Sequence, residues 1–125
     1  MLGSFDVMVF VPTKEPTRAR EFYENVLGLH FVADEPFALV FDANGITLRI
    51  AKVAELTPSP ATTLGWVVHD IASMVKELTG KGVVFQRYDG PPQDDLGIAT
   101  FPGGAKVAWF KDPDGNLLSL SQPGG

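Results

Sequence analysis

Two similar stretches of sequence limit what this chain can fold into. Residues 41–45 read FDANG and residues 110–116 read FKDPDGN, and each stretch lies between two runs of residues typical of strands. From Gly45 and Gly115 onward the following strands align without a gap, at an offset of 115 − 45 = 70 residues. In the second stretch, Pro113 presets its own φ, Asp114 tolerates a left-handed backbone, and glycine adopts a positive φ at no steric cost. We therefore predict two hairpins and one folding unit that occurs twice.

The first half of the chain predicts a strand, a helix and three further strands. Residues 5–11 (FDVMVFV) favour a strand, and a helix follows, capped by Thr13 or Glu15 and ended by Gly28. Further strands are expected over residues 29–33, 37–41 and 46–52. Alternation along the first strand places Val7, Val9 and Val11 on one face and Asp6, Met8 and Phe10 on the other.

The second half repeats this order after a linker. Residues 53–62 contain two prolines and no apolar period, which is typical of a connection. A strand over 63–68 leads to Asp70, a good cap for a helix that Gly80 ends. Strands over 83–86 and 96–101 then precede the second hairpin. The expected modules are residues 4–52 and 63–122 of a single domain that spans 1–125.

Each module has one helix, which can cover one face of its sheet. The other face must be covered by the other module, by a second subunit or by a ligand, and a pocket could form there. The alternative is that the two remaining faces pack together as ordinary core.

Composition excludes several classes of function. Apolar residues make up 45% of the 125 residues and charged residues 20%, which indicates a globular protein. The net charge of −5 disfavours binding to nucleic acid and to anionic membranes. The chain has no cysteine, hence no disulfide and no thiolate chemistry, which suits a cytoplasmic protein. No apolar run is long enough to span a bilayer.

Three motifs carry a resemblance to a known family. Residues 19–29 (AREFYENVLGL), 64–71 (LGWVVHDI) and 110–116 (FKDPDGN) resemble the vicinal oxygen chelate superfamily, which includes glyoxalase I, extradiol dioxygenases and fosfomycin- and bleomycin-resistance proteins. Residues 89–107 resemble a bacterial branch described only as glyoxalase-like. The resemblance covers essentially the whole chain. It implies an α+β fold in which two tandem βαβββ modules form a curved mixed sheet with the helices outside, and a homodimer.

The resemblance also implies a divalent metal, and the residues at the corresponding positions argue against one. Those positions fall on Met8, Arg49, Thr63 and Ser119. Arg49 is a cation, Met8 is a soft ligand, and the two hydroxyls are weak neutral ligands. The two histidines, His30 and His69, lack the paired spacing of a metal site. We therefore predict no metal and no other cofactor.

A metal-free site would be lined by the same face of the sheets. The predicted ligand-binding residues are Met8, Phe10, Thr47, Arg49, Thr63, Val67, Trp109 and Ser119, with Leu117 beside them. This mostly apolar set with one cation suits a planar or anionic organic molecule.

Several of these roles have an alternative. Arg49 could clamp a carboxylate or be ion-paired within the protein, and Trp109 could stack on a ligand or belong to the core or a dimer interface. Trp66 is expected in the core. Tyr88 and Asp89 could reach the mouth of a pocket. The adjacent carboxylates Asp94 and Asp95 are expected to be solvated loop charges, and no catalytic residue is identified.

We hypothesise a small-molecule-binding protein of the bleomycin-resistance type, with a ligand held in a concave cleft without a metal. One alternative is an enzyme, of the glyoxalase, lyase or dioxygenase type, with non-standard or metal-free chemistry. A second is a structural or regulatory module whose cavity is filled by its own side chains.

Overall fold

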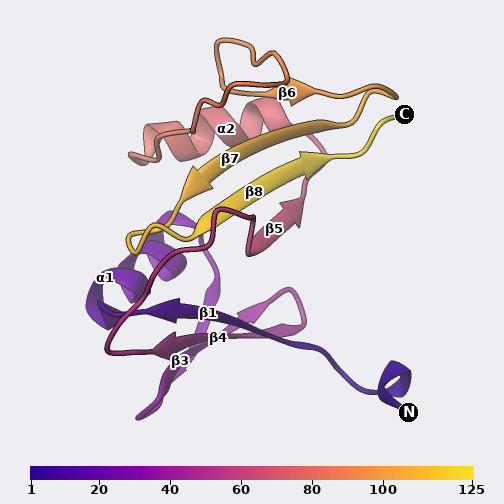
Figure 1. Cartoon of the computed structure of the whole chain (residues 1–125). Coiled ribbons are helices and arrows are strands. Elements are labelled where there is room, and N and C mark those ends of the chain that lie inside the picture. Colours follow the sequence, from indigo (N-terminus) through magenta and orange to yellow (C-terminus); the bar gives the residue numbers. More distant parts are fainter. The chain divides into compact units, whose positions relative to one another are not determined.

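The computed structural model describes residues 1–125 and contains two compact units. Unit 1 is Met1–Thr57 and unit 2 is Pro58–Gly125, so the boundary falls inside the expected linker. Each unit holds one four-stranded mixed sheet with helical structure on one face, which confirms the predicted βαβββ repeat (Figure 1).

Unit 1 has its strands in the order β1-β4-β3-β2. Only the β1–β4 pair is parallel. Its elements are η1 (Leu2–Ser4), β1 (Met8–Thr13), α1 (Pro16–Glu21), η2 (Phe22–Val26), β2 (His30–Asp34), β3 (Ala38–Ala43) and β4 (Ile46–Lys52). β1 starts three residues later than predicted and continues through Pro12, which an edge strand tolerates because one side of its backbone is unpaired in the sheet. The predicted helix is α1 continued by the π-helical turn η2, and Glu15 is its N-cap residue without a side-chain capping bond.

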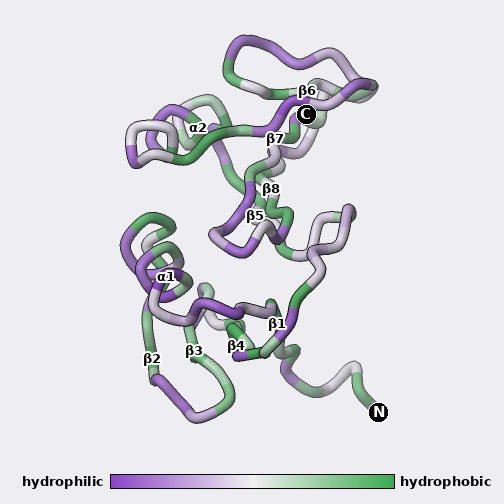
Figure 2. The backbone as a smooth tube through the Cα atoms, turned by 60° about the vertical axis from the view of Figure 1, so that its left-hand side comes forward, coloured by the Kyte–Doolittle hydropathy of each residue, from purple (hydrophilic) through white to green (hydrophobic).

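Unit 2 has the equivalent order β5-β8-β7-β6, again with one parallel pair, β5–β8. Its elements are β5 (Leu64–Val67), α2 (Ile71–Gly80), β6 (Ala99–Thr100), β7 (Lys106–Lys111) and β8 (Leu117–Gln122). Figure 2 shows hydrophilic residues concentrated in the loop that precedes β6. No helix of the structure is both long and apolar enough to cross a membrane.

The strand expected over residues 83–86 does not form, and the one over 96–101 shrinks to the two residues of β6. Only Phe85 pairs with β7, opposite Phe110, and the Gln86 N–H then donates to the Trp109 carbonyl. The Gln86 carbonyl instead accepts a hydrogen bond from the side-chain amide of Gln93. The ladder therefore ends there, because a side chain has taken the acceptor that a further strand pair would need.

The register of the sheets confirms the repeat. Val9 pairs with Leu48 in unit 1, and Leu64 pairs with Leu118 in unit 2. The offsets are 64 − 9 = 55 and 118 − 48 = 70, the second of which is the offset of the two turn glycines. The parallel strands of both units therefore present equivalent residues on equivalent faces.

The turns agree with the prediction except at one position. Gly115 has a φ of +86°, whereas the one non-glycine residue with a positive φ is Asn44 in the first turn and not Asp114. In the second turn, the Asp112 carboxylate accepts hydrogen bonds from the N–H groups of Asp114 and Asn116, both at 2.9 Å. These bonds fix the turn without requiring a left-handed aspartate.

Aromatic contacts show which face of each sheet carries the helix. In unit 1, Tyr23 of η2 packs on Phe41 of β3, with ring centroids 6.0 Å apart. In unit 2, α2 contacts β7 and β8, and Trp66 stacks on the buried Phe110 with ring centroids 6.3 Å apart. Trp66, which was expected in the core, therefore packs against it but is itself only half-buried. The opposite face of each sheet is called its open face below.

Candidate functional site

The open face of unit 1 carries the four residues predicted there. Met8 pairs with Thr47, and Phe10 pairs with Arg49, in the parallel β1–β4 ladder. Because alternate residues of paired strands point the same way, all four side chains share one face. Met8 and Phe10 are 49% and 60% exposed, so this face presents apolar side chains to solvent.

Arg49 is ion-paired within unit 1. Its Nη1 lies 3.0 Å from Oε1 of Glu35. The neighbouring cation Lys52 is held in the same way, by the Asp34 carboxylate at 2.5 Å and the Glu35 carbonyl at 2.8 Å. Of the two roles open to Arg49, the structure therefore shows the ion pair, which offsets much of its charge before any ligand arrives.

The open face of unit 2 brings together the other predicted residues. Thr63 donates to the Leu117 carbonyl from both its N–H, at 2.9 Å, and its hydroxyl, at 3.1 Å. Trp109 pairs with Ser119 across the β7–β8 ladder. Val67 lies at the end of β5 and is 75% exposed.

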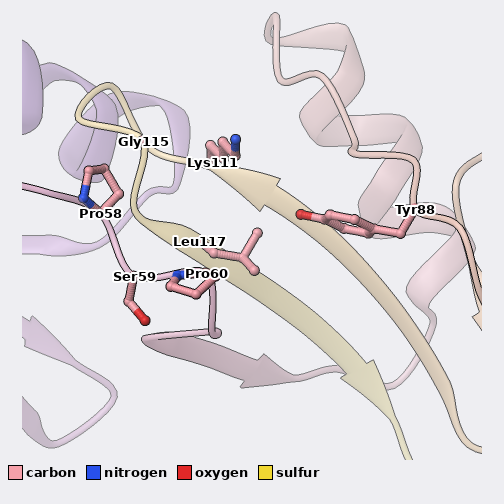
Figure 3. Close-up of a pocket in the computed structure, with 7 residues that line it drawn as sticks. All are labelled: Pro58, Ser59, Pro60, Tyr88, Lys111, Gly115 and Leu117. Carbon is pink, nitrogen blue, oxygen red and sulfur yellow. The ribbon is translucent and has the colours of Figure 1, made fainter.

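A pocket of about 380 Å³ lies on this face at Leu117 (Figure 3). It is lined by Pro58, Ser59, Pro60, Tyr88, Lys111, Gly115 and Leu117. Lys111 and Leu117 are paired residues of β7 and β8, so they share the open face with Trp109 and Ser119. Of the predicted ligand-binding residues none lines this pocket, although Leu117, named beside them, does.

Tyr88 enters the pocket wall from the loop before β6. Its ring packs edge-on against Trp109, with centroids 5.6 Å apart and ring planes at 90°. Its backbone N–H donates to Oε1 of Gln93 at 2.8 Å. In Figure 3 the hydroxyl end of Tyr88 points toward Leu117. Tyr88 thus reaches the pocket as the sequence suggested, whereas Asp89 does not line it.

The two loop aspartates do not line the pocket either. Asp94 accepts hydrogen bonds from the N–H groups of Leu96 and Ile98, both at 2.9 Å. The guanidinium of Arg87 donates to the backbone carbonyls of Asp94 and Asp95. Asp94 therefore stabilises the loop, while the Asp95 side chain is exposed.

Sequence reasoning missed Lys111 and the segment 58–60. The sequence motif marks Lys111 only as part of the turn, although its spacing of two from Trp109 along β7 places it on the open face. Residues 58–60 lie in the predicted linker, and no local signal in the sequence marks them as part of a pocket. Pro58 lies close to Gly115, where an added Cβ would be 3.2 Å from Cγ of Pro58.

The positions that the resemblance associates with a metal do not fit one. Arg49 is a cation engaged with Glu35, and the Thr63 hydroxyl donates to a backbone carbonyl. No group of three or more His, Asp or Glu side chains is placed to hold a metal ion. His30 and His69 are both exposed and lie in different units.

Comparison with known proteins gives a family and a set of similar structures. A model of the Glyoxalase/Bleomycin resistance protein/Dioxygenase superfamily matches residues 6–120. A search of curated proteins finds no match.

Three solved structures illustrate the similarity. A glyoxalase family protein from Enterococcus faecalis has a TM-score of 0.74 at 20% identity, covering 97% of this chain and 99% of that one. A lactoylglutathione lyase from Agrobacterium tumefaciens has 0.73 at 13%, covering 95% and 93%. TnmS3, an antibiotic binding protein from Streptomyces sp. CB03234, has 0.71 at 24%, covering 96% of both. At these sequence identities, the similarity shows a shared fold and nothing more.

Proposed function

We propose that this chain, which belongs to the glyoxalase/bleomycin resistance protein/dioxygenase superfamily, binds a small organic molecule. The ligand binds on the open face of unit 2, and no metal ion is needed. The observation that carries this proposal is the pocket of about 380 Å³ at Leu117. Ligand pockets in proteins have volumes of roughly 300–1,000 Å³ and combine apolar walls with a few polar groups. This pocket has that character, since Leu117 and two prolines are joined by one lysine, one serine and one phenol.

The proposal that no metal ion is needed rests on the side chains at the positions that correspond to metal ligands. Binding of Zn²⁺, Ni²⁺ or Mn²⁺ needs several imidazole or carboxylate ligands that converge. The residues at the corresponding positions are Met8, Arg49, Thr63 and Ser119, and they supply none of these groups. The likeness in fold to an antibiotic binding protein supports binding as the class of function.

A pocket-filling variant tests this proposal. Ser59 is exposed and lines the pocket, so Ser59→Trp should occupy it without disturbing the sheet. We expect native mass spectrometry to find a co-purifying small molecule on the wild type and none on Ser59→Trp. Thr79→Trp, at an exposed position on α2, is the matched control and should retain the ligand.

Metal addition separates this proposal from the enzymatic alternative. Zn²⁺, Ni²⁺ and Mn²⁺ should leave the melting temperature unchanged, and elemental analysis should find no stoichiometric divalent ion. A bound ion at one per chain with a raised melting temperature would overturn the metal-free proposal and support a glyoxalase- or dioxygenase-type enzyme.

The proposal includes a homodimer in the cytoplasm. The open faces of the two units carry exposed apolar side chains such as Phe10 and Val67. A second copy of the chain would shield these side chains from water. Light scattering coupled to size exclusion measures the mass directly, and a value near that of one 13.5 kDa chain would overturn the dimer.

A further inference from the structure

The pocket of unit 2 contains one full charge, on Lys111. The other six lining residues are neutral: Pro58, Ser59, Pro60, Tyr88, Gly115 and Leu117. The Lys111 ammonium makes no hydrogen bond or ion pair within the protein, in contrast to Arg49 and Lys52 of unit 1. Lys111 is therefore the cation at this pocket that remains available to an anion.

The neighbouring carboxylate of Asp112 is committed elsewhere. It is buried in the turn and accepts hydrogen bonds from the N–H groups of Asp114 and Asn116. The side-chain amide of Asn116 donates to its second oxygen at 2.9 Å. These three donors hold Asp112 in the turn, so it does not neutralise the ammonium of Lys111 through an ion pair.

Tyr88 adds a hydrogen-bond donor on the other side of Leu117. Its hydroxyl has no partner within the protein, and Figure 3 shows it directed toward Leu117. Its ring packs edge-on against Trp109, a contact that favours this orientation of the phenol. An ammonium and a phenol that both lack partners can bind the two oxygens of one carboxylate.

The rest of the lining favours a flat apolar body. Leu117 and the rings of Pro58 and Pro60 make up its apolar lining (Figure 3). We infer that this pocket takes a flat aromatic carboxylate, with its ring against Leu117 and the prolines and its carboxylate between Lys111 and Tyr88. This inference rests on the proposed function and specifies its ligand class.

A phosphate group fits the pocket less well. Phosphate sites use several backbone N–H groups or more than one cation. Here the Gly115 N–H donates to the Asp112 carbonyl at 3.0 Å, and Lys111 is the single cation. One positive charge matches the single negative charge of a carboxylate.

Calorimetric titration with 2-naphthoate and with 2-naphthamide tests the inference. The two molecules share a ring system, and only the first is charged. A charge-assisted hydrogen bond is worth enough to change affinity about tenfold, so we expect 2-naphthoate to bind the wild type about tenfold more tightly. Raising the salt concentration should reduce this preference, because salt screens an exposed charge pair.

Variants of two lysines on the same strand locate the effect. Lys111→Gln should abolish the preference for the anion, and Lys111→Arg should retain it. Lys106→Gln is the matched control, because Lys106 lies on the other face of β7, and it should leave both affinities unchanged. An equal preference in the wild type and Lys111→Gln would overturn the inference.

Ser59→Trp distinguishes this inference from the proposed function. If both naphthalene compounds bind equally well and Ser59→Trp abolishes both, the pocket binds ligands and the carboxylate inference is wrong. If Ser59→Trp changes neither affinity, the compounds bind elsewhere, and the proposed function of this pocket as a ligand-binding site is wrong.

Discussion

Gly65 and Ser119 stand opposite each other in the parallel β5–β8 pair, and a β-carbon on Gly65 would lie 2.6 Å from Oγ of Ser119. That distance is far shorter than a van der Waals contact. Ser119 also stands at one of the positions where the metal-dependent enzymes that this sequence resembles have a metal ligand. It is only 8% exposed. The absence of a side chain at Gly65 therefore leaves the space that the Ser119 hydroxyl occupies.

Gly65→Ala should destabilise the protein because of this contact. Alanine in a strand is ordinarily better than glycine by roughly 0.5–1 kcal/mol, but overpacking costs about 1–3 kcal/mol. We expect a net loss of about 1 kcal/mol in the free energy of unfolding, measured by urea denaturation. In a Ser119→Ala background, which removes Oγ, Gly65→Ala should become neutral or stabilising, and an equal loss in both backgrounds would contradict this account.

The two turn glycines form a matched pair for measuring the contact between Pro58 and the second hairpin. Gly45 and Gly115 have φ values of +92° and +86°, so alanine is strained at both. A Cβ at Gly45 meets nothing within 4 Å, whereas at Gly115 it meets Pro58 at 3.2 Å. Gly115→Ala should therefore lower the free energy of unfolding by about 1 kcal/mol more than Gly45→Ala.

A Pro58→Ala background serves as the control for this pair. Removing the proline ring removes the contact, so the two glycine substitutions should then cost nearly the same in chemical denaturation. A difference that persists would mean that the contact with Pro58 is not its cause.

The sequence predicted the repeat and the strand register because both depend on local patterns. Alternation along β1 placed Met8 and Phe10 on one face, and the turn glycines located Arg49 and Ser119, as the ladders confirm. The prediction of a strand over 83–86 was wrong because the side chain of Gln93, in the loop that follows, bonds to the Gln86 carbonyl at which strand pairing would continue.

The site was less predictable because it depends on contacts between distant residues. Pro58 of the segment 58–60 and Gly115 line the same pocket, although they are 115 − 58 = 57 residues apart in the sequence. The Lys111 ammonium has no ion pair with Asp112 because the Asp112 carboxylate accepts hydrogen bonds within its own turn. This depends on the side-chain rotamer of Asp112, which the sequence does not specify. The partner of Arg49, Glu35, was one of several carboxylates that the sequence could have offered.

Asp70 should make the stability of unit 2 depend on pH. The Ser73 N–H and then the Ser73 hydroxyl donate to its carboxylate, and these bonds lower the pKa of Asp70 below 3.8. Because folding lowers this pKa, the stabilisation is complete above 3.8 and is lost as the pH falls through the folded value. The melting temperature of Asp70→Ala should thus lie below that of the wild type at neutral pH and approach it in acid.

Asp70→Asn is the control for this pH dependence. Asparagine caps a helix about as well as aspartate but does not titrate in this range. Its advantage over Asp70→Ala should persist into acid, where the advantage of the wild type disappears. A constant gap between wild type and Asp70→Ala down to low pH would show that the ionised carboxylate is not what caps α2.

Gln93 should control both the stability of the loop before β6 and the position of Tyr88. Its amide accepts from the Tyr88 N–H and donates to the carbonyls of Gln86 and Gly97, at 2.8, 2.9 and 2.8 Å. Each such bond contributes roughly 0.5–1.5 kcal/mol, so Gln93→Ala should cost about 1–3 kcal/mol in the free energy of unfolding. Hydrogen exchange at the Tyr88 amide should become faster, and affinity for 2-naphthoate should fall because the phenol loses its position.

Gln93→Glu separates the two effects. Glutamate keeps an acceptor for the Tyr88 N–H and loses both donors, so the Tyr88 amide should stay protected while the loop loses stability. Asp95→Asn changes a neighbouring exposed side chain and should alter neither quantity. If Gln93→Ala left exchange at Tyr88 and the affinity for 2-naphthoate unchanged, the edge-on contact with Trp109 alone would be sufficient to hold Tyr88 at the pocket.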